Sequence, residues 1–226
     1  MAQLISALAW DVDGILVDTE NLKFLAWTDL LQERGVQYTL KEYKLVVGQS
    51  FVNILDWLGK HKGIYAEKDE FKSCWLRYYN ERRKGGVALI YRNIQLLKDF
   101  HKFLPQMPKV AASSDAENID SNLELAGVRD IFLATVSPKN HKGIRSKPAP
   151  DIYLLAVKLL GIPADRCLAF EDSQPGVIAA KEAGLKCVAL PNLFTEKQDF
   201  SRADHIFPSK SSLVIDEIIR KGVIFY

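Results

Sequence analysis

Two groups of acidic residues stand directly behind apolar segments and have the composition of a cation site. Asp11 and Asp13 are separated by one residue and are followed by Gly14, which frees the backbone for a sharp turn. Glu171 and Asp172 form the second group, also behind an apolar segment. Carboxylates gathered without His or Cys repel one another unless a hard cation lies between them, and ligation by oxygen alone suits Mg2+. The acidic groups therefore predict a magnesium site, although acid pairs at strand ends also serve as turn residues or helix caps.

Hydroxyl and lysine side chains follow two further parts of the chain. Ser113 and Ser114 come directly after the strand expected at residues 109–112, and Lys147 begins the sequence Lys-Pro-Ala-Pro-Asp ahead of an expected helix. Hydroxyls, backbone N–H groups and a lysine at strand ends and helix starts are what a phosphate dianion needs. Taken singly, Ser113 reads as a helix cap and Lys147 as a solvated charge. Taken together with the acidic groups, they favour a phosphate site.

Apolar segments of strand length must position these residues. Strands are expected at residues 4–10, 109–112, 131–136, 167–170 and 186–190, with a short one at 205–207. Helices are expected at residues 94–103, 116–126, 151–160 and 175–183, and the last three precede Gly127, Gly161 and Gly184. Strands that alternate with helices indicate an α/β fold with a three-layer, Rossmann-like parallel sheet, in which ligands bind at the carboxyl ends of the strands.

A helical insertion interrupts this alternation. Nearly a hundred residues separate the first strand from the second, far more than one crossover helix requires. Amphipathic segments at residues 21–34, 51–60 and 68–83 fill this interval, and Gly85-Gly86 is a natural hinge at its end. We therefore expect an all-helical cap domain over residues 18–86 and a core domain over residues 1–17 and 87–226.

Composition excludes several classes of partner. The 226 residues are 48% hydrophobic and 26% charged, and a net charge of +2 gives no electrostatic reason to expect nucleic acid or an anionic membrane. The three cysteines lack metal-ligand spacing and are expected to pack in the interior. The apolar N-terminus has no basic leader, so neither a signal peptide nor a membrane span is expected. A monomer in the cytoplasm is the simplest expectation, with an organelle stroma left open.

In this combination the sequence resembles the haloacid dehalogenase superfamily with an inserted helical cap, and the resemblance covers nearly the whole chain. It implies that Asp11 is a nucleophile that forms an aspartyl phosphate and that Asp13 is the general acid and base. It further implies that Ser113 and Lys147 hold the phosphate of a small phosphoester. The implied Mg2+ ligands are Asp11, Asp13, Glu171 and Asp172. An acid at position 13 argues against the dehalogenases of this superfamily, because halide leaves without protonation.

The substrate class depends on finer features. Residues 13–20 resemble both the beta-phosphoglucomutase group and the CbbY-type sugar bisphosphate phosphatases. Lys23 stands where both groups usually carry His, and the loop around Gly48 lacks the Lys and Arg with which the mutases grip a second phosphate. The segment from Pro191 resembles the CbbY type. A sugar phosphate or sugar bisphosphate phosphatase is therefore favoured, with a mutase second and a catalytically idle binding protein third.

Further residues are candidates for contact with the substrate. They are Glu20, Lys23, Gly48, Gln49, Ser50 and Ser114. The tryptophans of the cap, Trp27, Trp57 and Trp75, have helical spacing and are expected to pack in its interior. The basic loop at residues 139–145 could attract a second phosphate, but solvated loop charge is the alternative.

Overall fold

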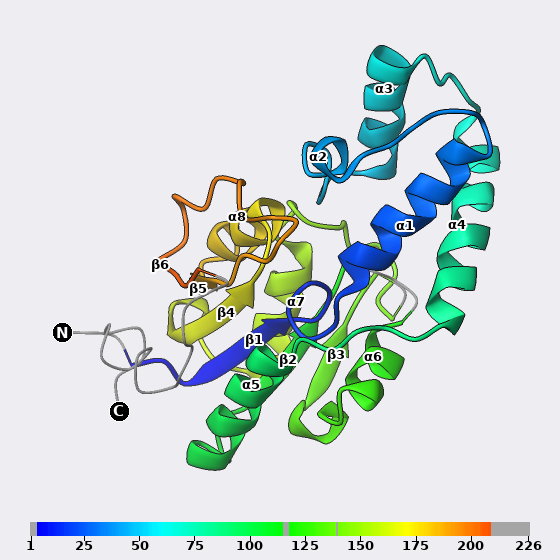
Figure 1. Ribbon diagram of the computed structural model, residues 1–226. Helices are drawn as coiled ribbons and strands as arrows, with labels where there is room; N and C mark the ends of the chain where they lie inside the picture. The colour runs from blue at the N-terminus through cyan, green and yellow to red at the C-terminus, as the bar shows by residue number, and fades with distance from the viewer. Residues whose placement is uncertain (1–3, 115–117, 139, 209–226) are drawn as a thin grey trace. The chain divides into compact units, whose positions relative to one another are not determined.

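The chain forms two compact units. The computed structural model describes residues 4–114, 118–138 and 140–208, whose ribbon is drawn in Figure 1. One unit is Met1–Val17 with Leu89–Tyr226, and the other is Asp18–Ala88. The assignment of a cap function to residues 18–86 stays a prediction.

The first unit contains a parallel sheet of six strands in the order β3-β2-β1-β4-β5-β6. The strands are β1 (Ala7–Asp11), β2 (Lys109–Ala112), β3 (Ala134–Val136), β4 (Cys167–Glu171), β5 (Lys186–Ala189) and β6 (His205–Ile206). Every neighbouring pair is parallel, which confirms the expected α/β fold. The chain runs from β1 through β2 to β3 on one side and then crosses to β4 on the other. The carboxyl ends of β1 and β4 therefore border the topological switch point, where open α/β sheets bind ligands.

Helices cover both faces of this sheet. They are α5 (Tyr91–Phe103), α6 (Ile119–Leu125), α7 (Asp151–Leu160) and α8 (Gln174–Glu182), with the short 3-10 helices η1 (Arg129–Ile131) and η2 (Ala164–Arg166). Helix α7 packs on β2 and β3, and α8 packs on β4 and β5 and against α7 (Figure 1). Alternation of side chains along β1 sends Ala7 and Ala9 into the apolar cluster beneath α7 and α8.

Aromatic packing fills the opposite face of the sheet. The Trp10 ring in β1 stacks on Phe170 in β4 with centroids 4.0 Å apart. Phe100 of α5 meets both rings edge-on, at 6.2 Å from Trp10 and 5.6 Å from Phe170. These rings join the two central strands to α5 directly below the strand ends that carry the acidic residues.

The second unit is a bundle of helices in a fully described segment. Its elements are α1 (Thr19–Gln32), α2 (Leu40–Tyr43), α3 (Phe51–Lys62) and α4 (Lys68–Lys84). The Trp27 ring is buried between Phe51 and Trp75, whereas Trp57 is half-buried and stacks on His61. Among the described residues of the whole chain, no helix combines the length and hydropathy needed to cross a membrane.

Several expected element boundaries are wrong. The strand expected at residues 131–136 is only Ala134–Val136, because Arg129–Ile131 forms a 3-10 turn closed by the Phe132 N–H on the Arg129 carbonyl. Strand β1 begins at Ala7 rather than at residue 4, and α5 begins at Tyr91 rather than at residue 94. The short helix α2 was not expected; a capping box between Thr39 and Glu42 starts it. Part of the helix expected at residues 116–126 lies outside the described residues.

Truncation of Phe170 tests the aromatic layer. The change Phe170→Ala leaves a cavity against Trp10 and Phe100, so we expect a loss of about 3–5 kcal/mol in the free energy of unfolding. Urea titration followed by circular dichroism measures it. The matched control Phe103→Ala removes a ring that is 58% exposed and should change stability by less than about 0.5 kcal/mol. Equal losses in the two variants would contradict the packing described here.

Candidate active site

Three carboxylates meet at the carboxyl ends of β1 and β4. Asp11 is the last residue of β1 and Glu171 the last of β4, and Asp172 follows at once. Because the two strands are neighbours, one carboxylate oxygen from each residue lies within 4.8 Å of the others. All three residues are buried. The structure thus brings together three of the four predicted metal ligands.

Lys147 binds two of these carboxylates. Its ammonium contacts Asp11 Oδ1 and lies 2.5 Å from Glu171 Oε1. The Tyr153 hydroxyl on α7 donates to the same Glu171 Oε1 at 2.5 Å. Ser114 Oγ accepts from the Lys147 backbone N–H at 3.3 Å, which ties the Lys147 loop to the end of β2. Tyr153 was missed from sequence because an aromatic residue on the apolar face of a helix is typical of core packing.

Burial and charge govern the ionisation of this group. Burial raises the pKa of the Asp11 carboxyl well above its usual range, Lys147 opposes that rise, and Glu171 and Asp13 add to it. Burial by itself lowers the pKa of Lys147, but Asp11 and Glu171 outweigh it and hold that pKa above its usual value. Lys147 therefore stays protonated at neutral pH. The three buried acidic groups outnumber the one ammonium, and either a proton on Asp11 or an additional cation relieves this excess.

Asp13 lies beside the predicted phosphate-binding serine. Ser113 Oγ donates to Asp13 Oδ2, and Asn122 Nδ2 on α6 approaches Asp13 Oδ1 at 3.4 Å. The carboxylate of Asp13 is not a member of the three-carboxylate group, and its part in metal binding stays a prediction. Asp13 therefore contacts Ser113, which was predicted to bind the phosphate.

One carboxylate oxygen of the cluster has no hydrogen-bond donor. Glu171 Oε2 is buried and finds no partner, although Oε1 of the same group has two. The first turn of α8 closes over this carboxylate, since a Cβ on Gly176 would lie 1.9 Å from Oε2. A buried acceptor without a donor is costly unless a cation satisfies it. The three clustered carboxylates offer oxygen ligands alone, and this donor set fits a hard divalent ion such as Mg2+.

The remaining predicted residues have local partners inside the second unit. Glu20 accepts from Lys23 Nζ and from the Tyr43 hydroxyl, each at 2.7 Å. Ser50 is the N-cap of α3 and accepts from the Asn53 N–H at 3.2 Å. Within its own loop, Gln49 Nε2 donates to the Leu45 carbonyl at 3.1 Å, and Gly48 has a φ of 82°. Their contact with substrate stays a prediction, and the hydroxyl of Ser50 already has a structural role.

The basic loop is partly neutralised by its own surroundings. Arg145 forms an ion pair with Asp151 at 2.7 Å, and its backbone N–H donates to Asp151 Oδ2 at 2.9 Å. Lys139 lies outside the described residues. A role of this loop as a second phosphate site stays a prediction.

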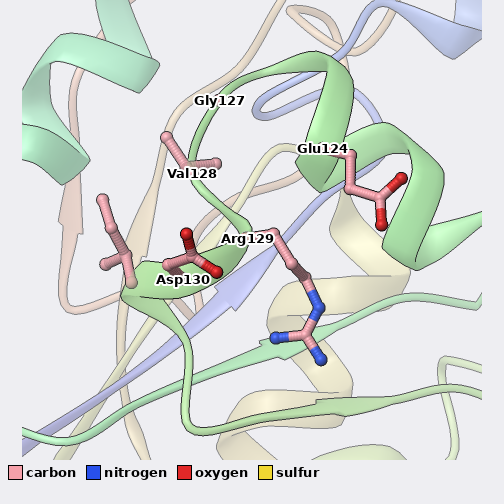
Figure 2. Close-up of a pocket in the computed structure, with 6 residues that line it drawn as sticks. Glu124, Gly127, Val128, Arg129 and Asp130 are labelled. Atoms are coloured by element: carbon pink, nitrogen blue, oxygen red, sulfur yellow. The ribbon is translucent and has the colours of Figure 1, made fainter.

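A surface pocket lies away from these residues. Figure 2 shows it at the end of α6 and in η1, where it is lined by Glu124, Gly127, Val128, Arg129, Asp130 and Ile131. The 3-10 helix η1 precedes β3, so this pocket belongs to the amino-terminal edge of the sheet. The candidate active site lies at the carboxyl edge and shares no residue with it.

Comparisons with known proteins agree with this geometry. Residues 5–184 match the family described as haloacid dehalogenase-like hydrolase. The chain is 32% identical over 211 residues to YhcW of Bacillus subtilis (strain 168), which covers 93% of this chain and 94% of YhcW. It is 27% identical over 187 residues to the phosphorylated carbohydrates phosphatase of Thermotoga maritima. This alignment covers 80% of this chain and 83% of that protein.

A solved structure shows the same likeness. CbbY from Rhodobacter sphaeroides in complex with phosphate superposes with a TM-score of 0.72 at 25% identity, over 90% of this chain and 94% of that one. Family match, phosphatase relatives and fold point the same way. The chain therefore belongs to the haloacid dehalogenase-like hydrolases, and within them it is a phosphatase, a hydrolase of phosphoric monoesters.

Proposed function

We propose that this phosphatase is magnesium-dependent and hydrolyses a small phosphoester, a sugar phosphate or sugar bisphosphate, through an aspartyl phosphate on Asp11. The observation that carries the proposal is the position of the Asp11 carboxylate at the end of β1, in contact with Lys147 and grouped with Glu171 and Asp172. In this proposal the nucleophile, the ammonium that binds phosphate and the carboxylates that bind the metal lie within one buried site.

The metal has a defined place in this proposal. Asp11, Glu171 and Asp172 would hold Mg2+, with Asp13 as the further ligand implied by family resemblance. When bound, Mg2+ neutralises part of the charge on the phosphoryl group. The oxygen-only donor set and the excess of buried acidic groups over the one ammonium support this assignment.

The residues of the chain divide the phosphoryl transfer between them. A carboxylate oxygen of Asp11 attacks phosphorus in line while the bond from phosphorus to the leaving oxygen breaks, and Asp13 gives that oxygen its proton. Lys147 and Ser113 stabilise the equatorial phosphoryl oxygens, and the backbone tie from Lys147 to Ser114 keeps that loop in place. Asp13 then takes a proton from water, whose oxygen attacks phosphorus and releases Asp11 and inorganic phosphate.

The substrate class rests on the relatives and on the second unit. One relative is named for phosphorylated carbohydrates, and the CbbY structure holds phosphate. In the second unit Glu20 and Lys23, which pair with each other at 2.7 Å, are proposed to contact the sugar phosphate. Gly48, Gln49 and Ser50 are further candidates for contact with the organic part.

Loss of the nucleophile tests the mechanism. In Asp11→Asn the neutral amide cannot form an aspartyl phosphate, so phosphate release from a phosphoester panel with Mg2+ should fall at least about a thousandfold. Circular dichroism checks that the variant is folded. Asp56→Asn, which alters an exposed carboxylate paired with Lys60, is the matched control and should keep full activity. Undiminished turnover in Asp11→Asn would exclude the aspartyl phosphate.

Metal removal tests the cofactor. Phosphate release should vanish in excess EDTA and return on addition of Mg2+, and in Asp172→Asn half-maximal activity should need at least about tenfold more Mg2+. The same Asp56→Asn control should show the wild-type Mg2+ dependence. Full turnover in EDTA would rule out a magnesium enzyme.

Product analysis separates the phosphatase from a mutase of the same fold. With beta-glucose 1-phosphate and a glucose bisphosphate activator, we expect any product to be inorganic phosphate and glucose. Chromatography resolves these from glucose 6-phosphate. Conversion to glucose 6-phosphate without phosphate release would establish the mutase instead.

A further inference from the structure

We infer that Asn192 is a positioning residue that fixes the carboxylate of Asp172 for Mg2+, an inference that rests on the proposed function. Asn192 follows β5 and is half-buried. Strands β1, β4 and β5 are neighbours in the sheet, so the loop after β5 opens beside the loops that carry Gly14 and Asp172. Its side chain joins these three loops.

The hydrogen bonds of Asn192 define which way its amide points. Oδ1 accepts from the backbone N–H of Phe194 at 2.8 Å and of Thr195 at 3.3 Å, so this oxygen faces its own loop. The amide nitrogen must then face the opposite way. There Nδ2 donates to Asp172 Oδ2 at 2.7 Å and to the Gly14 carbonyl at 3.2 Å. Both protons and the oxygen are engaged, which excludes the flipped orientation.

A donor on Asp172 Oδ2 has a consequence for metal binding. The terminal torsion of an aspartate is broad, so a carboxylate without a fixed partner samples many planes. A charge-assisted bond from an amide that is itself fixed at both ends holds one plane before the ion arrives. A carboxylate that is already held in one plane loses less conformational entropy when the ion binds. Groups that orient metal ligands in this way therefore strengthen metal binding.

Gly14 shows how closely this junction is packed. A Cβ at position 14 would lie 2.1 Å from Asp172 Oδ2 and 3.0 Å from Asn192 Nδ2, and Gly14 has a φ of 78°. The turn after β1 therefore presses its backbone against the Asp172–Asn192 pair. Asn192 links the turn that follows Asp11 and Asp13 to the carboxylate that follows β4.

Calorimetric titration of Mg2+ alone into the metal-free full chain tests this role, with no substrate present. In Asn192→Ala the amide donor is lost, and we expect the Mg2+ dissociation constant to rise about 10- to 100-fold. The control Thr195→Val removes the hydroxyl that accepts from the Asn192 backbone N–H at 3.1 Å but leaves the amide. Thr195→Val should keep the Mg2+ dissociation constant within about twofold even where it lowers stability.

A second variant, Asn192→Ser, keeps the test decisive if Asn192→Ala does not fold. The hydroxyl of Asn192→Ser is able to accept from the N–H groups of its loop but is too short to reach Asp172, so Mg2+ binding should weaken as in the alanine variant. Wild-type affinity in either folded variant overturns the inference, as does equal weakening in Thr195→Val. Absence of Mg2+ binding by the wild-type chain overturns the metal centre itself and is distinct from both results.

Discussion

Charge balance around Lys147 is the constraint on which the site depends. A buried ammonium and buried carboxylates are each unfavourable in isolation, and each becomes tolerable only through the other. Lys147 contacts Asp11 and Glu171, and Tyr153 shares the same oxygen of Glu171. Negative charge remains in excess after these contacts. A cation and a phosphate dianion can therefore enter the same small space, one drawn by the carboxylates and the other by the lysine.

Sheet topology is what makes this balance possible. Strand β1 lies in the middle of the sheet, and the chain reaches β4 only after visiting the other side. The acidic ends of β1 and β4 are thus neighbours although 160 positions separate Asp11 from Glu171 in the 226-residue chain. Stacked rings of Trp10 and Phe170 hold these strands together directly behind the carboxylates. Core packing and site geometry are consequently properties of the same two strands.

The periphery of the site extends beyond β1 and β4 to neutral amide side chains from other elements. Asn192 comes from the loop after β5 and holds Asp172 and the Gly14 carbonyl, and Asn122 approaches Asp13 from α6. A phosphoryl-transfer site needs its carboxylates fixed before the ligands bind, because rearrangement during the reaction costs free energy. Neutral amides suit this purpose, since they orient a carboxylate without adding to or cancelling its charge.

Local sequence patterns predicted the α/β class and the strand ends that carry Asp11, Ser113 and Glu171, because apolar periodicity and turn residues are local properties. The motifs at those strand ends pointed to the family. The sequence placed the start of β3 and of α5 wrongly, where single side-chain and turn contacts decide a boundary. Three contacts of the site became visible in the folded chain alone: Lys147 and Tyr153 share Oε1 of Glu171, Asp13 pairs with Ser113, and Asn192 orients Asp172. Tyrosine on an apolar helix face and asparagine in a loop are typical of core and turn positions. Their contacts with the site arise because residues remote in sequence converge at one sheet edge, which no local pattern encodes.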